Sequence, residues 1–121
     1  MKKLKQILIE DTIANLLKRL NIKVKIDKTK HAGERQSRHQ NDFIANSDII
    51  DVVNSGLEKI ANLLLFNEID INDHVLLKRK SDNLNVVTSI ERAGDKIDVV
   101  VITVMKEPNF RSEPGIKIIY I

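Results

Sequence analysis

VLLKRKSDNLNVVTSIERAGDKIDVVVITVM, residues 75–105, is the stretch that decides the fold of this chain. It contains three segments rich in Val, Ile and Leu, at 75–80, 84–90 and 96–105, joined by Ser-Asp-Asn and by Arg-Ala-Gly-Asp. β-Branched residues favour strands, and connections this short join antiparallel neighbours. We therefore predict a β-meander. The segment 96–105 is almost continuous Val and Ile, which predicts a central strand buried on both faces.

A fourth strand and a long helix flank the meander. Residues 115–121 follow a Pro-containing loop and have the composition of a strand. Before the meander, apolar residues recur at helical spacing from about 48 to 63, after the helix-start signal Asn-Ser-Asp. The apolar residues 63–66 are expected to finish this helix against the core. Gly56 falls inside it, where a glycine costs about 1 kcal/mol relative to alanine.

The first thirty residues are basic and amphipathic. Residues 3–20 have the spacing of one or two helices, and Asp11-Thr12 is a candidate cap that would divide them. Residues 22–27 alternate apolar and charged side chains, which predicts a short strand with its lysines facing outward. Basic residues outnumber acidic ones here, which suits a polyanionic partner and equally a solvated helix and strand.

Helices early in the chain and strands late in it predict an α+β fold. A chain of 121 residues is the size of one domain. We expect N-terminal helices packed on one face of a curved, mainly antiparallel sheet of four to five strands. Residues 1–28 would supply a basic helix and a short strand, and 29–121 the core of this single domain.

Composition excludes several classes of function. The chain has no Cys, which excludes disulfides, thiolate zinc sites and a cysteine nucleophile. Three Phe, one Tyr and no Trp leave little material for an aromatic base-stacking platform. The four glycines are isolated, so no phosphate-binding loop is present. No apolar run approaches membrane-spanning length, and we expect a cytoplasmic protein without a membrane partner. A net charge of +3 and a pI near 9.2 are compatible with nucleic acid.

Ionisable groups gather in HAGERQSRH, residues 31–39. A helix that begins near residue 31 would place four of these groups, from His31 to Arg38, on one face, with His39 beside that face. An imidazole, a carboxylate and guanidiniums on one face can bind a phosphodiester and move its protons. A solvated helix face has the same pattern, and Gly33 weakens the helix prediction. The five residues are His31, Glu34, Arg35, Arg38 and His39.

The remaining chemistry is phosphodiester cleavage without a metal. His31 and His39 are too far apart for the i, i+4 pair of a helical metal site, so we expect neither a metal nor another cofactor. No Gly-x-Ser-x-Gly motif is present to activate a serine. RNA cleavage needs a base for the 2′-hydroxyl, an acid for the leaving oxygen and cations for the phosphate, which His with Arg or Lys can supply. Lys78, Arg79 and Lys80 are candidate RNA contacts, or an ordinary charged edge strand.

The order of elements over roughly residues 30–121 resembles the RelE-like ribonucleases. The resemblance includes the His-x-x-x-Arg spacing of His31 and Arg35. It also includes the Thr-Val strand at 103–104, followed by the loop 108–114, PNFRSEP, and a last strand. It implies a metal-independent endoribonuclease of phage or toxin type that acts on RNA, with mRNA as the substrate and the ribosome or a ribosomal protein as an additional partner.

The resemblance implies roles for two residues. His31 would transfer protons, and Arg35 would bind the phosphate or stabilise the transition state. The second histidine of the family, on the following helix, has no counterpart between residues 48 and 62; His39 is our own candidate substitute, with Glu34 and Arg38 as further catalytic or RNA-binding candidates. Two alternatives stay open: a noncatalytic nucleic-acid- or protein-binding module, and a phage virion or assembly component.

Overall fold

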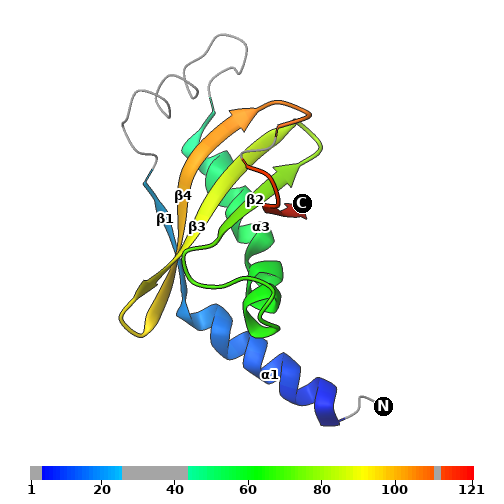
Figure 1. The fold of residues 1–121 in the computed structure, drawn as a ribbon, viewed down its shortest axis with the longest axis vertical. Coiled ribbons are helices and arrows are strands. Elements are labelled where there is room, and N and C mark those ends of the chain that lie inside the picture. The colour runs from blue at the N-terminus through cyan, green and yellow to red at the C-terminus, as the bar shows by residue number, and fades with distance from the viewer. Residues whose placement is uncertain (1–3, 26–43, 111–112) are drawn as a thin grey trace.

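The computed structural model describes residues 4–25, 44–110 and 113–121 (Figure 1). Two helices and five strands account for most of them, which confirms the predicted α+β class. In chain order the elements are α1 (Leu4–Arg19), β1 (Leu20–Val24), α3 (Asn46–Leu65), β2 (His74–Arg79), β3 (Leu84–Ala93), β4 (Lys96–Lys106) and β5 (Lys117–Tyr120).

The strands form one open sheet in the order β1-β4-β3-β2-β5. Strands β2, β3 and β4 are antiparallel neighbours joined by short turns, so the predicted meander is confirmed. The two outer strands pair in parallel, β1 with β4 and β5 with β2. The sheet is therefore mixed. Its inner strand pairs are antiparallel, as expected, whereas the expectation did not include the parallel pairing that adds both of its edges.

The middle strand is β3, not the Val- and Ile-rich β4. β3 is buried from Leu84 to Ile90 although it carries Asn85, Thr88 and Ser89. Polar groups are tolerated in such a position when they are hydrogen-bonded. Thr88 donates its hydroxyl to the carbonyl of Val75 at 2.9 Å. The continuous apolar run correctly predicted that β4 is an inner strand. It did not predict that β4 lies beside the middle strand β3 and is not the middle strand itself.

Helix α3 covers one face of the sheet (Figure 1). Its buried face consists of Ile49, Val52, Val53, Gly56, Ile60 and Ala61. These residues form one core with alternate residues of the strands, such as Val75, Leu77 and Val86. A fully buried Val, Leu or Ile contributes about 1.5–3 kcal/mol relative to an exposed one, so this layer supplies most of the stabilisation. The other face carries a smaller cluster of Leu76, Val87, Met105 and Phe110.

Several boundaries differ from the predictions. α1 is one helix that runs through Asp11 and Thr12, and α3 extends two residues beyond the predicted range at each end. Phe66 lies past the end of α3 and is 55% exposed, so it does not pack against the core as expected. β1 begins at Leu20, two residues before the predicted strand.

No helix in the part of the chain that the structure describes is long and apolar enough to cross a membrane.

One lysine of β1 takes part in an ion pair. Lys23 lies 3.1 Å from a carboxylate oxygen of Asp98 on the neighbouring strand β4, and the Asp98 side chain is only 9% exposed. The lysines of this strand were predicted to face outward, and the Lys23 side chain is about half exposed, as expected. Its ammonium nonetheless compensates a carboxylate that is otherwise buried.

Candidate nucleic-acid interface

The predicted site residues fall into two groups. His31, Glu34, Arg35, Arg38 and His39 lie outside the described residues, as does the helix predicted to carry them. Lys78 and Arg79 are the last two residues of β2, and Lys80 begins the turn that follows. The geometry below therefore concerns the second group and the residues around it.

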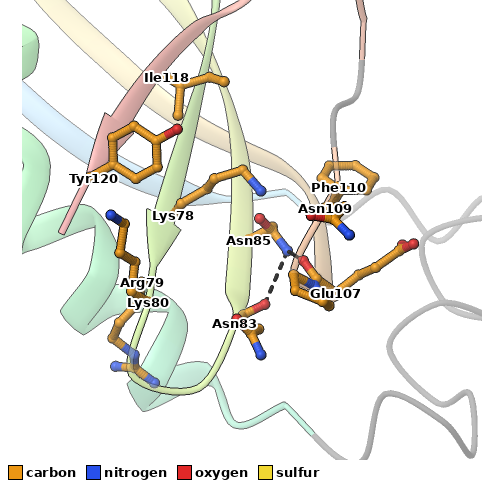
Figure 2. Close-up of a pocket in the computed structure, with 11 residues that line it drawn as sticks. Lys78, Arg79, Lys80, Asn83, Asn85, Glu107, Asn109, Phe110, Ile118 and Tyr120 are labelled. Atoms are coloured by element: carbon orange, nitrogen blue, oxygen red, sulfur yellow. Dashed lines mark hydrogen bonds between the residues drawn. The ribbon is translucent and has the colours of Figure 1, made fainter.

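A hollow of about 350 Å³ opens on the sheet face opposite α3, at the end of β2 (Figure 2). Its floor is a cross-strand row, because Lys78 pairs in register with Tyr120 on β5 and with Asn85 on β3. The loop after β4 forms the wall. The polar and aromatic residues that line the hollow are Lys78, Arg79, Lys80, Asn83, Asn85, Glu107, Asn109, Phe110 and Tyr120.

Lys80 and Tyr120 form one side of the hollow. The Lys80 ammonium lies 4.7 Å from the centre of the Tyr120 ring, which is within the range of a cation–π contact. Tyr120 is 51% exposed, so it presents an aromatic surface to solvent beside a positive charge. Figure 2 shows the Lys78 side chain reaching over Asn85 toward the loop of Asn109 and Phe110.

Asn85 connects the floor of the hollow to its wall. The residue is 1% exposed, and its side-chain nitrogen donates toward the carbonyls of Asn83 at 3.0 Å, Met105 at 3.0 Å and Glu107 at 2.7 Å. The same amide therefore binds the β2–β3 turn, the end of β4 and the first residue of the wall (Figure 2). Since each buried amide hydrogen bond restrains its partners, Asn85 fixes the position of the loop.

The wall is anchored at two further points. Phe110 is buried in the smaller apolar cluster with Leu76 and Met105. At the far end of the loop, Glu113 lies 2.8 Å from Nδ1 of His74, the first residue of β2. This places His74 in an exposed hydrogen bond with Glu113, at the opposite end of β2 from the hollow.

Arg79 points to the other face of the sheet. Its guanidinium donates to Asp82 at 3.0 and 2.7 Å and to Asp48, in the first turn of α3, at 3.3 Å. The hydrogen bonds to Asp82 are the main cause that raises the pKa of Arg79 above its ordinary value. Burial opposes this rise, and the hydrogen bond to Asp48 adds to it. The hydrogen bond from Arg79 is likewise the main reason why the pKa of Asp82 is lowered. Arg79 thus joins β2 to α3, away from the two lysines.

The hollow can bind an anion. It combines two ammonium groups, a phenol and side-chain amides with an apolar wall and one carboxylate, that of Glu107. Ammonium, hydroxyl and amide groups beside an apolar surface are the mixture found where small ligands with a negative charge bind. Within the described ranges no three His, Asp or Glu side chains are grouped so as to hold a metal ion.

Sequence reasoning found the two lysines and missed the rest of the hollow. The i, i+2 spacing of Lys78 and Lys80 places them on one face of an extended strand, which was a usable signal. Tyr120 and Asn85 carried no such signal, because their approach depends on the pairing of β5 and β3 with β2. No family model, curated protein or solved structure matches this chain.

Proposed function

We propose that the hollow binds RNA and that the chain is a metal-independent endoribonuclease of the RelE-like type, acting in the cytoplasm on mRNA. The observation that carries the proposal is the gathering of Lys78, Lys80 and Tyr120 around one opening on the sheet face opposite α3.

Each of these groups suits a part of a nucleotide. Phosphate oxygens accept hydrogen bonds from lysine ammonium groups, and such contacts supply most of the affinity of nonspecific nucleic-acid binding. Bases stack on exposed aromatic rings, which needs the base to be unpaired. A single tyrosine is a small stacking surface, so we expect single-stranded RNA to bind mainly through its phosphates.

The cleavage step is assigned to the sequence motif. In this proposal His31 accepts the proton of the ribose 2′-hydroxyl, and the 2′-oxygen attacks the adjacent phosphorus. The bond to the 5′-oxygen breaks, and that oxygen takes up a proton, which leaves a 2′,3′-cyclic phosphate and a 5′-hydroxyl. Arg35 stabilises the charge that develops on the phosphate. Glu34, Arg38 and His39 are the further candidates for the second proton transfer or for RNA contact.

A second candidate function is binding without cleavage. It is favoured by one observation: the described residues that line the hollow include no histidine. A module of this kind would hold RNA through the same lysines and would not depend on His31.

The test uses labelled single-stranded RNA in EDTA, with the purified chain and three variants. We expect the unaltered chain to bind and cleave the RNA. Lys78→Gln with Lys80→Gln should weaken binding at least tenfold, whereas Lys96→Gln, at the opposite end of the sheet from the hollow, should not. His31→Ala should bind RNA and leave it intact.

The outcomes separate the candidates. Binding without cleavage by the unaltered chain favours the binding module. Equal loss of binding in the Lys96 variant and in the double variant would mean that net charge alone attracts RNA, and the hollow would not be the site. A chain that shows no affinity for RNA refutes both candidate functions.

A further inference from the structure

The outer edge of β5 borders a second groove, which shares Ile118 and Tyr120 with the hollow and none of the residues of its wall. The groove has a volume of about 370 Å³ and lies between β5 and the last turns of α3. From α3 it is lined by Lys59, Asn62 and Leu63, which recur at the three- and four-residue spacing of one helix face. β5 supplies its whole length, from Lys117 to Tyr120.

The backbone of β5 can accept another strand. β5 is the last strand in the order of the sheet, and its inner side pairs with β2. The N–H of Ile121 donates to the carbonyl of Lys78 at 2.8 Å, so in a parallel ladder residues of the same parity as Ile121 face β2. The backbone groups of Ile118 and Tyr120 therefore point to the outer side.

One side-chain contact supports this orientation. The Lys59 ammonium donates to the carbonyl of Tyr120 at 2.9 Å, from the side of the groove. A side chain that can move away is thus bound where a neighbouring strand would pair. Short length and lysines are devices by which edge strands avoid pairing with chance partners, and they do not prevent pairing with an acidic one.

The positive charge of the groove favours an acidic binding partner. Its lining includes two lysines, Lys59 and Lys117, and no carboxylate among the described residues. Lys80 lies on the same edge, over the ring of Tyr120. A second copy of β5 would bring a second set of these lysines to the same edge, and this like charge opposes pairing between identical edges. Leu63 and Ile119 supply an apolar base for alternate side chains of an incoming strand.

We propose that the β5 groove is a docking site for an extended acidic segment of a partner protein, which adds to the sheet as a sixth strand beside β5. Its backbone pairs with Ile118 and Tyr120, its carboxylates contact Lys59 and Lys117, and its apolar side chains pack on Leu63. This inference goes beyond the proposed function and does not depend on it, because no nucleotide enters the argument.

The test is a titration of the isotope-labelled chain with a blocked heptapeptide of alternating valine and glutamate, followed by NMR. We expect saturable shifts at residues 118–121 and around Lys59. Two control peptides are methylated, one on all valine amides and the other on all glutamate amides. Alternate residues direct their N–H groups to opposite edges of the peptide strand, so one of the two peptides lacks the donors that face β5. At least that peptide should bind about fivefold more weakly than the parent. A peptide with lysine in place of glutamate should bind at least tenfold more weakly.

Variants of the chain complete the test. Lys59→Glu with Lys117→Glu should lower the affinity for the acidic peptide at least tenfold, and Lys96→Glu should leave it unchanged. If both methylated peptides bind as well as the parent, strand addition is refuted. The proposal is also refuted if the shifts lie elsewhere, or if they appear without peptide as the chain self-associates, which would make a second copy the occupant.

Discussion

Replacing Asn85 with alanine should loosen the wall of the hollow and lower the stability of the whole domain. The side chain has two N–H hydrogens, which are shared among three carbonyl oxygens at 2.7–3.0 Å. Each hydrogen bond contributes about 1 kcal/mol net, and the contact with Met105 is buried, so its loss leaves a carbonyl without that donor. The expected loss of unfolding free energy for Asn85→Ala is therefore about 2–4 kcal/mol.

The measurement is urea unfolding followed by circular dichroism, with the midpoint and the slope fitted together. For a chain of this size the loss corresponds to a decrease of roughly 8–16 °C in Tm. Asn54→Ala is the matched control, because Asn54 is an exposed residue of α3; it should change the free energy by less than about 0.5 kcal/mol.

A loss below about 1 kcal/mol for Asn85→Ala would refute the reasoning, since the three contacts would then contribute nothing beyond what water supplies. An unchanged midpoint with a lower slope would also contradict it, because the effect would then lie in the unfolded chain.

Three further predictions concern packing, acid stability and binding. A Cβ atom at Gly56 would lie 3.0 Å from a leucine methyl of β2, so Gly56→Val should destabilise the fold by about 2–3 kcal/mol in the same urea assay; a variant as stable as the parent would show that the helix can move away from the sheet. Arg79 lowers the pKa of Asp82 in the folded protein, so the pair stabilises the fold above about pH 4 and this contribution is lost as the pH falls through the folded pKa. Asp82→Asn should therefore be less stable by about 1 kcal/mol at pH 7, with a gap that closes in acid; a constant gap from pH 7 to pH 2 would contradict the linkage. If Lys78 and Lys80 each contact one phosphate, replacing both with glutamine should reduce the slope of log K against log salt for single-stranded RNA by about 1.4, and an unchanged slope would exclude them as phosphate ligands.

Local sequence patterns predicted the elements better than their arrangement. The strands of the meander and the long helix follow from alternation, helical spacing and turn residues, all of which act within a few positions of the chain. The parallel pairing of Leu20 with Ile97 and of Val75 with Lys117 brings together residues that are far apart in sequence. No local pattern encodes such pairing, so the mixed character of the sheet was not predictable in this way.

The same limit applies to the candidate site. Lys78, Arg79 and Lys80 were predicted together, as a basic run at the end of a strand. Arg79, between the two lysines, could be assigned to the other face by the alternation of a strand, but its carboxylate partners come from α3 and from the turn after β2. Tyr120 joins the hollow only through the register of β5, and the roles proposed for His31 and Arg35 stay predictions.

The two kinds of strand pairing have a consequence for how the domain opens. β2, β3 and β4 are linked by short turns. In contrast, β1 pairs with β4 and β5 pairs with β2, and in both pairs the two strands are far apart in the sequence. Closing a long loop costs more entropy, so the three inner strands are expected to form early and exchange their amide hydrogens last, and the flanks to detach at a lower free energy. The candidate RNA surface would then combine two parts of different local stability. Asn85 and Lys78 lie on the inner strands, which unfold last, and Tyr120 lies on β5, which detaches first.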